Sequence, residues 1–218
     1  MTMGKLSEMI VNVDQSNATE KEIGEQLKEL LSMGQTKVQL FRQEIEASLR
    51  NGKTPDNRKL PVSKVLGTYE EYRTYTNRTK EELEKNVEDI AAGVLGNVGD
   101  EIIHGISSLL TQELSLILGA ARGKEMMRTV CYVLVEYPRI LRLDVAMWAK
   151  TIGEKPLCNR INNVIACVTY KSEVDVGNLD FNEFLGLYAT VLNEGFGEQK
   201  QDIRKKILEV RKMFDMVH

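Results

Sequence analysis

Several residue types and patterns that mark common protein classes are scarce or missing in this chain. No apolar run reaches the about 18 residues that a transmembrane helix requires, so no membrane-spanning helix is expected. There are only two histidines, His104 and His218, which argues against a histidine-rich metal site. The cysteines, Cys131, Cys158 and Cys167, are odd in number and lack CxxC spacing. This excludes the usual patterns of a disulfide framework or a zinc site, and free thiols are expected.

The chain also lacks the excess of basic residues that binding to a nucleic-acid backbone requires. Its formal net charge is -3, so no nucleic-acid partner is expected. Aromatic residues make up only 6% of the chain and there are nine methionines, which indicates an aliphatic, adaptable core. Residues 1–14 have no long apolar stretch, so no signal peptide is expected and the predicted location is cytoplasmic.

The most strongly patterned segment is 99–119. On a helical wheel its apolar residues share one arc: Ile102, Ile103, Ile106, Leu109, Leu110, Leu114, Leu116 and Ile117. Such a face has to be covered by the protein's own fold, by a second copy or by a membrane. Glu113 lies inside this arc. Because an unpaired buried carboxylate is costly, we expect Glu113 to lie at the margin of the core or to meet a cation from another element.

The N-terminal region contains a second amphipathic helix. After a capping-box pattern at 19–22, core-type positions alternate by four and three residues: Ile23, Leu27, Leu31, Gly34, Val38, Phe41, Ile45 and Ser48. The Asn51-Gly52 pair predicts its end. This helix packs either within the fold or against a helix of another chain. We predict an N-terminal helical segment (1–55) and a main domain (56–218), or a single domain overall, with an exposed loop over 51–61 as the boundary.

The predicted fold class is α+β, predominantly helical, with a small antiparallel sheet inside residues 128–171. Segments 129–137, 140–146 and 163–170 are rich in β-branched and aromatic residues and favour strands. Residues 126–137 and 140–152 are also long enough for helices, so an all-α fold is the alternative. Further helices are predicted near the tyrosines at 69, 72 and 75, after the cap at 180–183, and over 202–217.

No motif identifies a reaction, a cofactor or a small-molecule substrate, so the chain is not expected to be an enzyme. His104 is expected to be a surface histidine, because a neighbouring serine on one helix does not establish a nucleophile site. We therefore predict a structural or interaction protein that forms homo-oligomers through amphipathic helices. The alternative is a pore-forming toxin that inserts the helical hairpin 88–123 into a membrane surface. The candidate interaction residues are Leu27, Leu31, Val38, Phe41, Ile45, Ile102, Ile106, Leu109 and Glu113.

Overall fold

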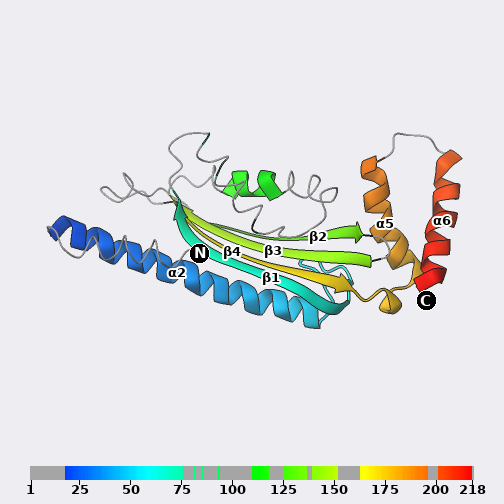
Figure 1. Cartoon of the computed structure of the whole chain (residues 1–218), viewed down its shortest axis with the longest axis horizontal. Coiled ribbons are helices and arrows are strands. Elements are labelled where there is room, and N and C mark those ends of the chain that lie inside the picture. The colour runs from blue at the N-terminus through cyan, green and yellow to red at the C-terminus, as the bar shows by residue number, and fades with distance from the viewer. Residues whose placement is uncertain are drawn as a thin grey trace.

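The computed structural model describes residues 18–75, 81, 85, 93, 110–117, 125–136, 139–151, 163–195 and 201–217. A 33-residue helix comes first, and a helical hairpin ends the described chain (Figure 1). The elements are α2 (Ala18–Arg50), β1 (Val62–Tyr75), a helical segment at 110–117, β2 (Glu125–Glu136), β3 (Arg139–Thr151), β4 (Asn163–Val174), η2 (Val176–Asn178), α5 (Phe181–Gly195) and α6 (Gln201–Val217).

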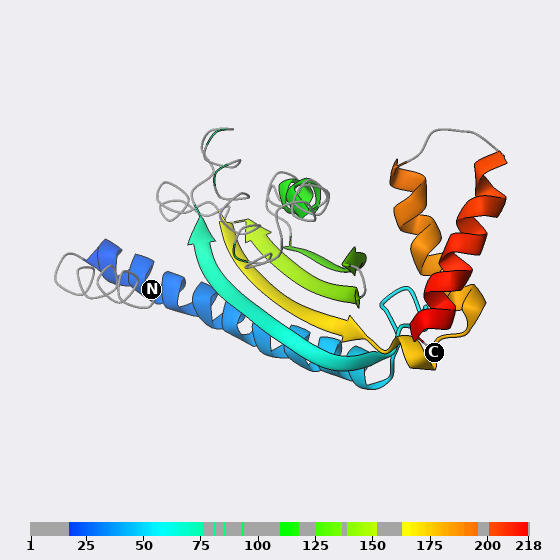
Figure 2. The same cartoon turned by 45° about the vertical axis from the view of Figure 1, so that its right-hand side comes forward.

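The four strands form one curved antiparallel sheet in the order β1-β4-β3-β2 (Figure 2). The two edges of this sheet differ in regularity. β1 pairs with β4 through a register that shifts twice, between Val62 and Lys64 and between Val65 and Gly67. β2 pairs with β3 residue for residue over its whole length, with no shift. The first edge is therefore bulged between Val62 and Gly67, whereas the second is regular throughout.

Helix α2 covers one face of the sheet, which we call the α2 face (Figure 1). Its buried side chains Val38, Phe41 and Ile45 pack against the following sheet residues: Ala146, Trp148, Val164, Ala166, Val168 and Tyr170. Gly34 allows close approach to β1, because a Cβ there would lie 3.2 Å from the Cβ of Tyr72. The glycine that interrupts the heptad-like pattern is therefore a packing residue.

Segment 110–117 covers the other face, which we call the 110–117 face (Figure 2). Leu110, Leu114 and Ile117 are fully buried. They share a cluster with Leu134, Leu141, Leu143, Val145, Met147, Ala149, Ile165 and Cys167. Nearer β1, a Cβ on Gly93 would lie 2.5 Å from the hydroxyl oxygen of Tyr69, so the chain approaches the sheet closely there too. The described part of the most amphipathic segment is thus covered within one chain.

A third apolar cluster joins α5 and α6 to the end of the sheet. Leu60, Ile140, Val174, Leu179, Phe184, Leu187, Tyr188 and Val210 form its buried part. The predicted capping box at the start of α5 is confirmed. The Glu183 amide donates to Asp180 Oδ1 and the Asp180 amide donates to Glu183 Oε2, each at 2.8 Å. Residues far apart in sequence meet here because the sheet ends beside the helical hairpin.

Three fold expectations are wrong. The chain is mixed α+β, neither predominantly helical nor all-α, because four strands of 12 to 14 residues form a full sheet. The sheet is also not confined to 128–171, since β1 lies at 62–75. The tyrosines at 69, 72 and 75 belong to this strand and not to a short helix. β1 is stabilised by pairing with β4 about a hundred residues later, which a local capping pattern does not reveal. The strands expected at 129–137, 140–146 and 163–170 are confirmed and are longer than expected.

Candidate functional site

A buried ion pair lies on the α2 face of β3. The side chains of Arg142 and Asp144 are 0% and 1% exposed. The guanidinium donates to both carboxylate oxygens, Nε to Oδ2 at 2.7 Å and Nη2 to Oδ1 at 2.8 Å. This fork-to-fork contact is the strongest geometry available to the two groups.

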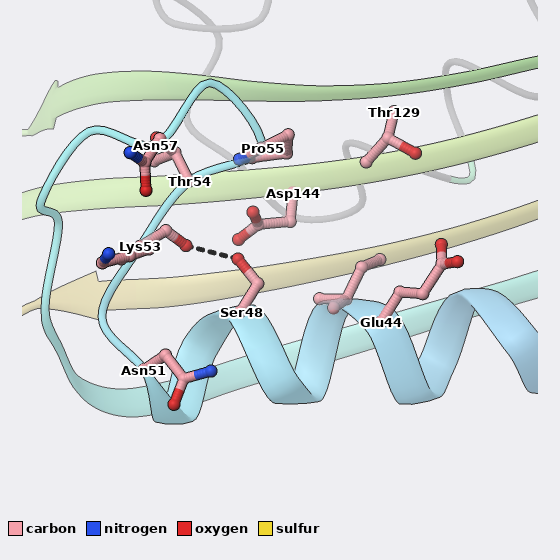
Figure 3. Close-up of a pocket in the computed structure, with 10 residues that line it drawn as sticks. Glu44, Ser48, Asn51, Lys53, Thr54, Pro55, Asn57, Thr129 and Asp144 are labelled. Carbon is pink, nitrogen blue, oxygen red and sulfur yellow. Dashed lines mark hydrogen bonds between the residues drawn. The ribbon is translucent and has the colours of Figure 1, made fainter.

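Arg142 also holds the loop that follows α2. Its Nη1 donates to the Leu60 carbonyl at 2.9 Å, and its Nη2 lies 2.8 Å from the Lys53 carbonyl and 2.7 Å from Ser48 Oγ. The Ser48 hydroxyl in turn donates to the Lys53 carbonyl (Figure 3). The dipole of α2 also favours a cation at its C-terminal end, where the Arg142 guanidinium lies. One side chain therefore joins the sheet, the end of α2 and the loop.

The loop at 51–61 has its own internal order. Gly52 and Asn57 have positive φ angles of 59° and 63°, and Leu60 donates its amide hydrogen to the Gly52 carbonyl at 2.7 Å. Thr54 donates to Asp56 Oδ1 at 2.5 Å, which lowers the pKa of Asp56, with Arg58 adding to the effect. The predicted boundary between segments is thus a folded turn that closes onto the sheet.

A cavity of about 390 Å³ lies between this loop, the end of α2 and the sheet (Figure 3). Most of the residues that line it are polar by type, and Asp144 points into it from the sheet. The lining residues are Glu44, Ile45, Ser48, Asn51, Lys53, Thr54, Pro55, Asn57, Thr129 and Asp144.

Burial shifts the pKa of two titratable groups at or beside this cavity, Asp144 and Cys131. Burial raises the pKa of Asp144, while Arg142 acts in the opposite direction. Burial, and then the charge of Asp144, raises the pKa of the Cys131 thiol to about 12. Because the thiolate is the nucleophilic form, Cys131 is not activated at neutral pH. The cluster therefore binds its own loop and does not present a nucleophile.

The predicted interaction residues have several locations. Val38, Phe41 and Ile45 are buried against the sheet, Leu27 is buried and Leu31 is half-buried. Ile102, Ile106 and Leu109 lie outside the described residues, as do both histidines and Cys158. Cys131 and Cys167 are free thiols. The part of the α2 stripe that lies over the sheet is therefore occupied within the chain.

Glu113 lies at the margin of the 110–117 face. Its carboxylate meets the guanidinium of Arg128 on β2, with Arg128 Nη2 at 2.7 Å from Oε1. The Glu113 side chain is 16% exposed and that of Arg128 is 51% exposed. A cation from another element thus meets this acid, which was the interpretation favoured from the sequence.

The regular edge of the sheet belongs to the same region. β2 ends the strand order, so among the described residues no strand pairs with its outer side. Met127 on this strand is 55% exposed, and Arg128 follows it. A long edge strand without bulges presents backbone donors and acceptors to any further strand. This edge is the candidate interaction site.

Arg142 and Asp144 alternate with Leu141 and Leu143 in the sequence, which predicts a strand with one polar face, but the structure buries both charged side chains. Ala146 and Trp148 continue the same alternate positions with apolar side chains. A strand that is apolar on both faces is a central strand, covered on both sides. That signal was available, but only the structure shows that α2 and the loop cover this face.

Searches against protein-family models, curated proteins and solved structures gave no match to this chain. Within the described ranges, no group of three or more His, Cys, Asp or Glu residues is placed to hold a metal ion. None of the helices in those ranges combines the length and the apolar character needed to cross a membrane.

Proposed function

We propose that this protein is a self-associating structural or interaction protein that assembles through the β2 edge of its sheet. The observation that carries this proposal is the contrast between the two sheet edges. β1 carries two register shifts, a common device that prevents edge-to-edge pairing, whereas β2 keeps an unbroken register over 12 residues. A β2 edge of this kind favours the addition of another strand.

The burial of α2 and segment 110–117 against the sheet also supports the β2 edge as the surface of assembly. Phe41 of α2 and Leu114 of segment 110–117 are each 0% exposed, because the sheet of the same chain buries them. These two positions therefore have no free apolar face to offer a partner. The edge of β2 offers backbone hydrogen-bond donors and acceptors to a further strand.

Light scattering coupled to size-exclusion chromatography tests the proposal. The wild-type chain is expected to elute as a dimer or a larger assembly at micromolar concentration and to dissociate on dilution. A mass of one chain, 24.7 kDa, at every concentration would contradict the proposed function.

Membrane insertion of segment 88–123 is a second candidate, supported by how its described part is held. Residues 110–117 are attached to the sheet by three buried apolar side chains and by the marginal Glu113–Arg128 pair. Release from the sheet would expose that apolar face to lipid. Dye release from anionic vesicles at acidic and neutral pH is the test, and intact vesicles under all conditions would contradict this candidate.

A further inference from the structure

We infer that two copies of this chain pair antiparallel through β2 about a two-fold axis at Tyr132, with Arg128 of each copy opposite Glu136 of the other. This inference rests on the proposed self-association and specifies its geometry. The product is one continuous sheet in which β2 of each copy is central. The axis is perpendicular to the sheet, so the 110–117 faces of both copies lie on the same side.

Symmetry and the strand period limit the registers that are available. In an antiparallel pair about this axis, residues that face each other point to the same side of the sheet. Successive residues of a strand point to opposite sides, so two residues can face each other only if their numbers differ by an even number. The two-fold axis therefore passes through a residue, and moving it to the next residue shifts the opposing strand by two residues. On β2, the side chains of Val130, Tyr132 and Leu134 lie on the 110–117 face.

The charged residues of β2 favour one of these registers over the others. Within β2 the charged residues are Glu125, Arg128 and Glu136. A register centred on Val130 places Arg128 opposite Tyr132, and one centred on Cys131 places it opposite Leu134. The register centred on Tyr132 places Arg128 opposite Glu136 twice, because the axis repeats the pair. Opposite charges directly across an antiparallel pair are favourable, and like charges are unfavourable.

The same register joins apolar residues between the two charge pairs. Val130 lies opposite Leu134 on the 110–117 face, again twice, and Tyr132 lies opposite its own copy. The paired region runs from residue 128 to residue 136 and leaves the exposed Met127 just outside it. Aliphatic and aromatic cross-strand pairs of this kind add to the stability of a sheet.

Arg128 already has a partner within its own chain. Glu113 contacts its Nε and Nη2, and the guanidinium has further donors for a second carboxylate. Glu113 therefore acts as a positioning residue that orients Arg128 at the edge. This gives the acid in the apolar arc a role in assembly without placing it in direct contact with the second copy.

Disulfide trapping tests the register directly. In a parent with Cys131, Cys158 and Cys167 replaced by alanine, Tyr132→Cys places two thiols directly opposite each other, with Cα atoms about 4.5 to 5.5 Å apart. Val130→Cys is the matched control on the same strand and face. Its two copies would be offset by four residues, about 13 Å along the strand, too far for a disulfide.

The expected result is oxidised dimer from the Tyr132→Cys variant and none from Val130→Cys or from the parent. A wild-type dimer in which neither variant forms a disulfide, or only Val130→Cys does, overturns this register and leaves self-association standing. A wild-type chain that is monomeric overturns both. Circular dichroism of each variant shows whether the fold is retained.

Charge reversal provides a second measurement that needs no cysteine. In a background of Glu113→Gln and Arg139→Gln, which removes the intrachain partner of Arg128 and the cation that faces Glu136 on β3, Glu136→Arg places like charges together twice across the dimer and should weaken dimerisation about tenfold. Adding Arg128→Glu restores opposite charges and should restore affinity. Glu209→Arg on the exposed surface of α6 is the control and should leave the dissociation constant unchanged. Failure of the double reversal to restore affinity overturns the Arg128–Glu136 pairing.

Discussion

The two faces of the sheet are covered in different ways. On the 110–117 face the buried cluster is apolar, and the ion pairs Glu113–Arg128 and Glu71–Arg73 are partly exposed to solvent. On the α2 face an ion pair is fully buried beneath the end of α2. The difference follows from what each helix does over the sheet. α2 ends there and leaves a turn whose carbonyl groups need donors, and Arg142 supplies them.

Removal of the buried cation should give the largest effect. Arg142→Met leaves Asp144 buried without its cation and removes the guanidinium donors to the Leu60 and Lys53 carbonyl groups, so the free energy of unfolding should fall by about 3 to 5 kcal/mol. Urea denaturation measures the change. Arg50→Met, at a side chain that is 70% exposed, is the control and should cost less than about 1 kcal/mol.

A double variant tests why the loss occurs. Arg142→Met combined with Asp144→Leu removes both charges, so it should lose less stability than Arg142→Met alone. If Arg142→Met costs no more than Arg50→Met, the buried pair does not hold the α2 face together.

Truncation of one apolar side chain on each face should show that both layers belong to the core. Phe41→Ala on α2 should cost about 3 to 5 kcal/mol, and Leu114→Ala in segment 110–117 about 2 to 5 kcal/mol. Leu116→Ala, at a side chain that is 50% exposed, is the control for the second variant and should change stability by less than about 0.5 kcal/mol. Equal effects at Leu114 and Leu116 would mean that this segment does not cover the sheet.

Two glycines in helices distinguish the steric cost of a close contact from the gain in stability when glycine is replaced by alanine. Nothing lies within 4 Å of a Cβ placed on Gly186 of α5, so Gly186→Ala should stabilise the protein by up to about 1 kcal/mol. Gly34 faces Tyr72 across 3.2 Å, so Gly34→Ala should lose part or all of that gain. Thermal unfolding of the two variants compares them. An equal rise in midpoint would contradict the close approach of α2 to β1.

The smallest predicted effect is a pH dependence at the edge of the α2 face. Lys37, at 2.7 Å, and a hydrogen bond from Trp148 hold the pKa of Glu125 below its ordinary value of 4.5. A carboxyl whose pKa is lowered by folding stabilises the protein above its unfolded pKa, and this contribution is lost as pH falls through the folded pKa. Glu125→Gln should therefore cost less than about 1 kcal/mol at neutral pH and nothing in strong acid. Urea midpoints across this range measure the difference, and a constant difference would contradict the linkage.

Much of the local structure could be predicted from the sequence. The end of α2 at Asn51-Gly52, the capping box at Asp180 and Glu183, and the strand character of three apolar segments all depend on residues within one turn or one strand. β1 could not be found in this way, because its tyrosines at 69 and 72 also fit a helical spacing and its partner β4 is remote. The candidate edge could not be found either, since strand order is a property of the whole sheet.

The sequence by itself determined that 99–119 and the N-terminal helix carry apolar faces that must be covered, and that Glu113 needs a partner. Only the tertiary structure decided what covers the described parts of these faces. In the tertiary structure the sheet lies between α2 and segment 110–117, Arg128 lies beside Glu113, and β2 is the regular edge. The physical reason is the range of the interactions. A periodic pattern reports that a face must be buried, whereas its partner depends on strand pairing between residues far apart in the chain.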